Sequence, residues 1–435
     1  MLRCTLPTLV ASTLLAAPAA GAEIDRLALD ADVTYGYGRA TSSSMQGLLE
    51  AVPSVDATLS GPISFVASAR IRLDAVDELE PGEPAFDTYA SGSKPVTLGE
   101  AGAAEIRDFY LEFRGRRGLV RLGKQQIAWG RLDGIKVLDL VNPQEFREFI
   151  LDEFSESRIT LWSAYIDYSL GDWRAELAVI PDGTGHAIPD EGAWFELAAP
   201  RFRFGASPDQ PGLPVTTASP GHSMNETGAG LRLSRQVGNT ELAVLAYTGM
   251  DPEPLGRILA TGGTPQLERF YQRRDVAGFS VDTGLGRAVL RAEYAYQPSR
   301  VFNLRAPDGL DTVELDQHRG AIGLDVDGPL GVFINVQYLV DTIRDAPGTL
   351  VRPARDRVAT VFIRKAFGYD RLVLEARWYH SLTDDDDLTR LGIDYALNDS
   401  TSIRFAAEQF RGTPAGLFGQ FTDRGRITLG IRHTF

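Results

Sequence analysis

Apolar and polar residues alternate along most of the chain with a period of two. Residues 371–382 show this most clearly, with Leu372, Leu374, Ala376, Trp378 and His380 on one face and Arg371, Val373, Glu375, Arg377 and Tyr379 on the other. A period of two is typical of an extended β-strand with one apolar and one polar face. From Leu27 onward we count about 18 such segments of roughly 9–13 residues, the length of a tilted transmembrane strand, or about 16 if the least regular ones are not strands.

The connections between these segments alternate between short and long. The short ones are rich in Gly, Asn, Asp and Pro and lie at 60–62, 115–118, 170–172, 237–239, 284–286, 327–329, 368–370 and 398–400. The long ones lie at 40–48, 79–104, 131–157, 182–225, 250–272, 298–315, 342–356, 382–387 and 413–424. This asymmetry predicts an all-β fold, a transmembrane antiparallel β-barrel with short periplasmic turns and long external loops.

The last predicted strand runs to the final residue of the chain. Ile427, Leu429, Ile431, His433 and Phe435 lie on its apolar face. This ending resembles the C-terminal signal of outer-membrane β-barrel proteins, which the barrel-assembly machinery reads. The resemblance implies that Phe435 is the assembly signal, although a tyrosine or another bulky residue is more usual at the position of His433.

The first 22 residues have the features of a secretory signal peptide. Arg3 precedes an apolar stretch, and Ala20-Gly21-Ala22 provides a small-residue cleavage site. We expect export through the Sec pathway to the bacterial outer membrane, and removal of Cys4 with the signal. Residues 23–435 would then form one barrel without cysteine, because no change in composition marks a second domain.

Composition and motifs narrow the classes of function. The net charge of −14 makes nucleic-acid binding unfavourable. The chain has five histidines and neither a GxSxG nor an HExxH motif, so we expect no enzyme activity, no cofactor and no metal site. The acidic run 384–387 is interpreted as a solvated external loop rather than a Ca²⁺ site.

The polar rows of the predicted strands contain many arginines. The candidates for an inward, pore-lining position are Arg232, Arg291, Arg319, Arg364, Arg371, Arg377, Arg390, Arg404, Arg426 and Arg432. An arginine that faces hydrocarbon at mid-depth would cost about 2–4 kcal/mol, so these side chains are expected to face the lumen. They could either stiffen the wall by hydrogen bonding to one another or select anionic and polar solutes.

The connection 131–157 is too apolar for a solvated loop. Asn142-Pro143 begins a helix-compatible stretch in which Phe146, Phe149 and Ile150 share a face. We expect this connection to fold inward, as the loop after the fifth strand does in general porins, and to narrow the pore. The candidate constriction residues are Asp139, Glu145, Arg147, Glu148, Phe149, Asp152 and Glu153. A structural plug or an external cap is the alternative.

Residues 105–182 resemble a family of proteobacterial outer-membrane proteins described as a domain of unknown function. The matching residues are Arg107-Asp108-Phe109-Tyr110, the stretch 123–130, Arg147-Glu148-Phe149-Ile150-Leu151-Asp152 with Phe154, the stretch 173–177, and Ile180-Pro181. The resemblance implies a porin-like barrel but no particular substrate.

Three functions remain open from the sequence: a channel for small solutes, a transport barrel for hydrophobic or lipid-like compounds, and a structural protein with a closed lumen. Outer-membrane lipid, lipopolysaccharide, the barrel-assembly machinery and small solutes are the expected partners. The sequence does not indicate an oligomeric state.

Overall fold

The computed structural model describes residues 23–132, 134–207, 213–218, 226–261, 264–307 and 309–435. The expected signal peptide therefore lies outside the described residues.

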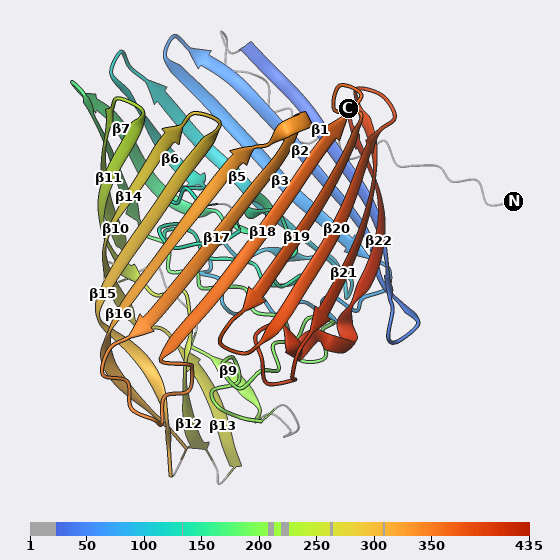
Figure 1. Cartoon of the computed structure of the whole chain (residues 1–435), viewed down its shortest axis with the longest axis vertical. Coiled ribbons are helices and arrows are strands. Elements are labelled where there is room, and N and C mark those ends of the chain that lie inside the picture. Colours follow the sequence, from blue (N-terminus) through green and yellow to red (C-terminus); the bar gives the residue numbers. More distant parts are fainter. Residues whose placement is uncertain (1–22, 133, 208–212, 219–225, 262–263, 308) are drawn as a thin grey trace, which may run out of the picture.

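Eighteen antiparallel strands close into a barrel (Figure 1). They are β1 (Glu23–Gly38), β2 (Ser43–Ser60), β3 (Ile63–Asp74), β5 (Gly102–Arg114), β6 (Gly118–Gln125), β7 (Leu161–Leu170), β8 (Trp173–Ile180), β10 (Gly228–Val237), β11 (Thr240–Met250), β14 (Arg273–Leu285), β15 (Ala288–Ala306), β16 (Gly309–Asp327), β17 (Val332–Ile343), β18 (Arg355–Phe367), β19 (Leu372–Ser381), β20 (Asp386–Ala396), β21 (Thr401–Arg411) and β22 (Arg426–Thr434). The first and last strands close the ring in a register that runs from Asp30↔Thr434 to Gly38↔Arg426. The predicted fold class is confirmed, with the larger of the two strand numbers.

The remaining elements are short and lie in the connections. They are β4 (Val96–Thr97), β9 (Val215–Thr217), β12 (Leu255–Thr261), β13 (Thr264–Phe270), α1 (Phe154–Ser157) and the 3₁₀ helices η1 (Pro329–Gly331) and η2 (Gly419–Arg424). None of the described helices is long and apolar enough to span a membrane.

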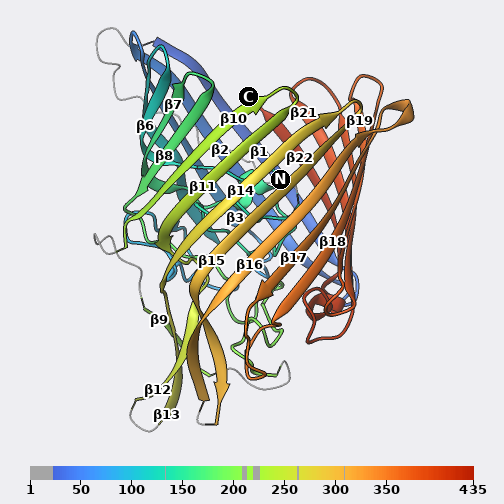
Figure 2. The same cartoon turned by 60° about the vertical axis from the view of Figure 1, so that its left-hand side comes forward.

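The short turns lie at one rim of the barrel, at the top of Figure 1, and we call this rim the short-turn end. The start of β1 and the end of β22 lie at the same rim. The longer connections lie at the opposite rim, the long-loop end, where β9, β12 and β13 form a small sheet beyond the barrel (Figure 2).

Three of the connections that we predicted to be long are short in the structure. Residues 298–315 belong almost entirely to β15 and β16, which continue past the barrel as one long hairpin (Figure 2). Phe302 packs there with Ile343 and Leu350, so the extended strands bury an apolar face of their own. The predicted connections 40–48 and 382–387 are turns of four residues each, because β2 already begins at Ser43 and β20 at Asp386.

Burial across the barrel wall is the reverse of that in a water-soluble protein. Leu391 and Leu429 are 53% and 52% exposed, whereas Arg426 and Glu408 are 3% and 1% exposed. In water this arrangement would leave apolar rows unburied, but in a bilayer those rows contact lipid. The alternation read from the sequence thus separates a lipid-facing row from a charged lumen.

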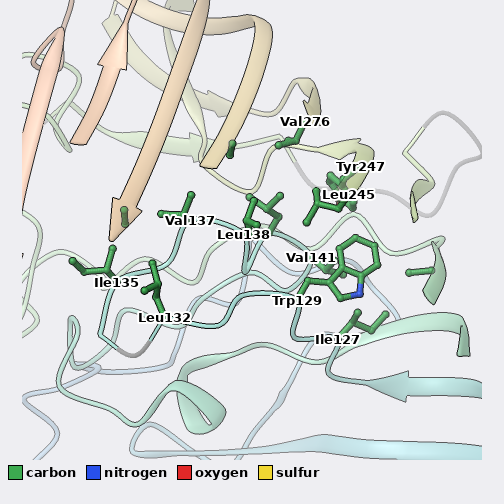
Figure 3. Packing of buried hydrophobic residues seen from close by; sticks show 14 of the residues in the cluster. Ile127, Trp129, Leu132, Ile135, Val137, Leu138, Val141, Leu245, Tyr247 and Val276 are labelled. Carbon is green, nitrogen blue, oxygen red and sulfur yellow. The ribbon is translucent and has the colours of Figure 1, made fainter. Parts of the chain in front are cut away.

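The connection 126–160 joins β6 to β7, and its described residues, 126–132 and 134–160, partly fill the lumen. Trp129, Val137 and Leu138 of this connection pack against Tyr247 of β11 and Val276 of β14 (Figure 3). Glycines in the wall make room for these side chains. A Cβ on Gly230 would lie 2.5 Å from the Trp129 ring, and one on Gly278 would lie 2.5 Å from Leu138.

The two-faced wall can be tested on adjacent residues of β20. Leu391→Arg places a charge on the exposed apolar row near the middle of the strand, and we expect it to lower the free energy of unfolding by about 2–4 kcal/mol. Gly392→Arg is the control, because Gly392 lines a lumen cavity and its added Cβ would meet only the Glu375 side chain at 3.7 Å. Denaturant titration of protein folded into lipid vesicles measures both. Equal losses would contradict the assigned faces.

Candidate functional site

The connection 126–160 extends across the barrel lumen. At one wall, the backbone N–H of Leu138 donates to Glu293 of β15 over 2.9 Å. At other strands, Glu145 pairs with Arg70 of β3, and Glu148 pairs with Arg426 of β22. Because these partners are spread around the ring, residues 131–157 are held from several sides inside the barrel.

The helix-compatible stretch after Pro143 does not form a helix. Gln144 and Glu145 instead make isolated β-bridges with Arg158 and Ala187, and Phe149 has a φ of +55°. Both features are incompatible with a continuing helix. As a result Phe146 lies against the His186 ring, while Phe149 packs on Phe418 and Phe421. The short helix α1 follows later in the segment.

Glu145 is the most enclosed acid of the segment. Its carboxylate accepts hydrogen bonds from the guanidinium groups of Arg70 and Arg72, and its side chain is almost fully buried. Burial alone would raise the pKa of Glu145, but Arg70, Arg72 and Arg147 hold it well below its usual value. Glu145 therefore stays ionised. Sequence reasoning missed Arg70 and Arg72, because they lie on the least regular predicted strands.

Glu148 makes a second set of buried contacts. Arg426 donates to it over 2.7 Å, Gln46 of β2 over 3.2 Å, and Arg147 lies 3.4 Å away. Burial raises the pKa of Glu148, but Arg426 and Arg147 lower it more, so the net shift is downward. Arg426 also pairs with Glu408 at 3.4 Å. A predicted wall arginine and a predicted segment acid are thus in direct contact.

Other contacts continue along the segment. Arg377 lies 3.5 Å from Glu153, and Arg432 lies 3.3 Å from Glu156. Arg390 donates to the carbonyl of Leu151. Asp139 differs from the other acids, because it pairs within the segment itself, with Arg158 at 2.8 Å.

The other predicted wall arginines pair mainly with acids of neighbouring strands. The ion pairs are Arg232 with Glu176 and Glu241, Arg291 with Asp282 and Asp325, Arg319 with Asp341, Arg364 with Glu375, and Arg404 with Asp32. Arg371 lies in the turn before β19, with its guanidinium 6.0 Å from the centre of the Tyr395 ring. Because most of these charges are compensated, the wall is a network of ion pairs rather than a plain basic ladder.

Two cavities flank the segment. The first, about 390 Å³, lies toward β1, β2 and β19–β22 and is lined by many charged groups, among them Glu148, Arg390 and Arg404; we call it the charged cavity. The second, about 420 Å³, lies toward the long-loop end and is lined by both apolar and charged side chains, with a mostly apolar surface; we call it the vestibule.

Asp152 lines both the charged cavity and the vestibule. Its Oδ2 atom is buried without a hydrogen-bond partner among the described residues. Burial, reinforced by Glu148, raises the pKa of Asp152 to about 7, even though Arg147 acts in the opposite direction. Asp152 therefore changes charge near neutral pH at the junction of the two cavities.

His186 lines the vestibule but has a structural contact. Its Nδ1 accepts a hydrogen bond from the backbone N–H of Gln144 over 2.8 Å. Burial lowers the pKa of His186 to about 4, so the ring is neutral at ordinary pH. Within the described residues, no group of three His, Cys, Asp or Glu side chains is placed to hold a metal ion.

Residues 25–389 match the family described as "Protein of unknown function (DUF1302)". The chain belongs to this family. The resemblance seen in residues 105–182 is thereby confirmed, and it extends over most of the sequence. A search of curated proteins found no match for this DUF1302 chain.

Solved structures of outer-membrane proteins share the fold. OccK8 (OprE) of Pseudomonas aeruginosa has a TM-score of 0.53 at 12% identity, covering 97% of this chain and 99% of that one. OccAB1 of Acinetobacter baumannii has a TM-score of 0.52 at 11% identity, covering 94% and 95%. OccK2 (OpdF) of P. aeruginosa, in complex with glucuronate, has a TM-score of 0.52 at 9% identity, covering 96% and 98%.

Replacing Glu145 tests how the segment is anchored. Glu145→Gln removes the carboxylate shared by Arg70 and Arg72, and breaking a buried ion pair costs about 3–5 kcal/mol. We expect a lower free energy of unfolding and faster proteolysis within 131–157. Glu153→Gln is the control, because its half-exposed pair with Arg377 should contribute less than about 1 kcal/mol. Equal effects of the two substitutions would contradict the anchoring role.

The raised pKa of Asp152 gives a second prediction. Below pH 7 the folded protein keeps a proton that the unfolded chain releases near 3.8, so stability from this group falls as pH rises through 7. Infrared titration should show a protonated carboxyl band that disappears near pH 7 and is missing from Asp152→Asn. Glu153→Gln should retain the band. A spectrum without that transition would contradict the assignment.

Proposed function

We propose that this chain is an outer-membrane channel for small solutes and that residues 126–160 form its narrowest section. The observation that best supports this proposal is the position of the segment. It crosses the lumen, is fixed to the wall by the buried pairs of Glu145 and Glu148, and separates two cavities that meet at Asp152. A loop held in this way leaves a defined passage rather than an open tube.

The outer surface supports the proposed location. Exposed apolar side chains on the strands fit a lipid environment, and the similar solved structures are outer-membrane proteins. Lipid and lipopolysaccharide would then contact the barrel exterior. Phe435 is 70% exposed beside the closing strand, where the barrel-assembly machinery could reach it, so its role as the assembly signal remains part of the proposal.

The electrostatics favour polar and charged solutes in the charged cavity. Arg390, Arg404 and Arg432 of the wall and Glu153 and Glu156 of the segment all line it, and Arg432 pairs with Glu156 at 3.3 Å. Opposite charges that line a narrow passage create a local field that orients dipolar solutes. OccK2, which shares the fold, was solved with the charged sugar glucuronate, and we extend a small-solute role to this chain.

Transport of hydrophobic compounds is the second candidate, and the apolar lining of the vestibule favours it. A closed structural barrel is the third. Planar-bilayer recording of the purified full chain separates them, since only the proposed channel predicts a stable ionic current. Persistent absence of current would contradict the proposed channel function.

A unique thiol at the junction tests the passage directly. The sequence contains only Cys4, in the expected signal peptide, so Asp152→Cys introduces a reactive group at one chosen place. Modification with a bulky, positively charged methanethiosulfonate should lower the single-channel conductance by more than about half, because the added group occupies the narrowest section.

Asp172→Cys is the matched control. Its side chain is 76% exposed in the turn between β7 and β8, away from both cavities, so the same reagent should leave the conductance unchanged. The parent chain should be equally insensitive. If the reagent leaves the conductance of the Asp152→Cys channel unchanged, the passage does not run past residue 152.

A further inference from the structure

The vestibule combines an apolar wall with a cluster of charges. Ile135 and Val137 of the segment line it, together with Leu339 of β17 and Val358 of β18. Leu339 and Val358 are direct cross-strand partners. Apolar residues that face the lumen are unexpected in a barrel that carries only water and ions, because polar side chains normally line an aqueous interior. These side chains are already largely buried, so a solute with an apolar body would cover only the apolar lining that the vestibule still exposes.

The charges of the vestibule form a connected chain of ion pairs. Arg274 contacts Asp251 at 3.3 Å, and Arg300 contacts both Asp251 and Glu253 at 2.6 Å. Arg352 lies 3.2 Å from Glu253 and 3.6 Å from Asp341, which in turn lies 3.3 Å from Arg319. This chain contains four guanidinium groups and three carboxylates, which leaves one positive charge.

Asp251 and Glu253 remain ionised in this chain. Burial would raise the pKa of each carboxyl group, but the neighbouring arginines shift both downward. Arg300 and Arg274 act on Asp251, and Arg352 and Arg300 act on Glu253. Asp251 and Glu253 therefore count as negative charges at ordinary pH, and the chain of ion pairs carries a single excess positive charge.

Arg319 stands at the end of this chain. Among the described residues its ion-pair partner is Asp341, and its Nε atom is buried without a hydrogen-bond partner. The side chain is 27% exposed and lines the vestibule, so guanidinium N–H groups are accessible to a solute. Arg319 faces Asp341 across the strands, and Leu339 is the next inward residue on the same strand as Asp341. A cation with incomplete hydrogen bonding thus lies on the strand next to the one that carries Leu339.

We propose that the vestibule binds amphipathic monoanions that consist of a compact apolar ring or chain and one carboxylate. The carboxylate would accept hydrogen bonds from Arg319, whose planar fork suits that group. The apolar body would lie against Leu339, Val358 and Ile135. A volume of about 420 Å³ is within the range of small-molecule sites. This inference rests on the proposed channel, since it names the class of solute that the passage selects.

Binding to the full chain in detergent micelles tests the site without any current. The probes are cyclohexanecarboxylate, acetate, which lacks the apolar body, and cyclohexylmethanol, which lacks the charge. Titration calorimetry, corrected with empty micelles, should give cyclohexanecarboxylate an affinity at least about tenfold above that of either comparison compound. Equal affinity for acetate and cyclohexanecarboxylate would overturn the proposal.

Variants locate the bound carboxylate. Arg319→Gln should weaken cyclohexanecarboxylate binding by about tenfold or more, because a charge-assisted hydrogen bond is lost. Arg319→Lys keeps the charge and should weaken binding less. Arg364→Gln is the matched control, since Arg364 is also a wall arginine with one acidic partner but does not line the vestibule, and it should bind as the parent chain does. Unchanged binding by Arg319→Gln would overturn the proposal.

Conductance separates this inference from the proposed function. In a conducting chain, cyclohexanecarboxylate should block the current at concentrations where acetate does not, and Arg319→Gln should abolish the difference. A chain that binds cyclohexanecarboxylate but conducts no current would contradict the proposed channel function and support the proposed anion-binding site. A chain that conducts but shows no preference among the three probes would support the channel and overturn the site.

Discussion

Charge compensation inside the barrel is the constraint on which the rest of the structure depends. Lipid requires the outward row of every strand to be apolar, so the charged residues of the chain collect in the lumen. A buried charge there is costly unless an opposite charge lies within reach. Glu145 and Glu148 meet this requirement for Arg70, Arg72 and Arg426, and the same contacts fix the crossing segment. Barrel stability and the shape of the passage therefore share one set of interactions.

Much of the fold could be predicted because the bilayer imposes a simple rule on each strand. Alternation in 371–382 and 426–435 identified real strands, and the turn residues identified the short-turn end. The same rule predicted that Arg426 faces inward, and the apolar character of 131–157 predicted that this segment needs a surface to pack on. Both inferences use only local sequence. The resulting contact between Arg426 and Glu148 joins the two predictions.

Features that depend on distant residues could not be read in this way. The β15–β16 hairpin extends past the barrel because Phe302 packs on Ile343 and Leu350. No local sequence pattern predicts that packing. The segment passes close to the wall because Gly230 and Gly278 lack side chains where Trp129 and Leu138 pack. Which acid neutralises which arginine is likewise set by strand register. Sequence reasoning named many of the charges but not their pairing, and so overstated the basic character of the wall.

Where compensation is nearly complete, the exceptions determine what a solute encounters. Among the buried polar atoms that lack a hydrogen-bond partner in the described residues are a carboxylate oxygen of Asp152 and the Nε of Arg319. Both line the vestibule, so they act on the same solute. An anion held by Arg319 meets a neutral group at Asp152 when the pH is below 7 and a negative one above it. Because the paired charges around them are already compensated, we expect the selectivity of the proposed passage to depend on these two side chains more than on the total number of arginines in the wall.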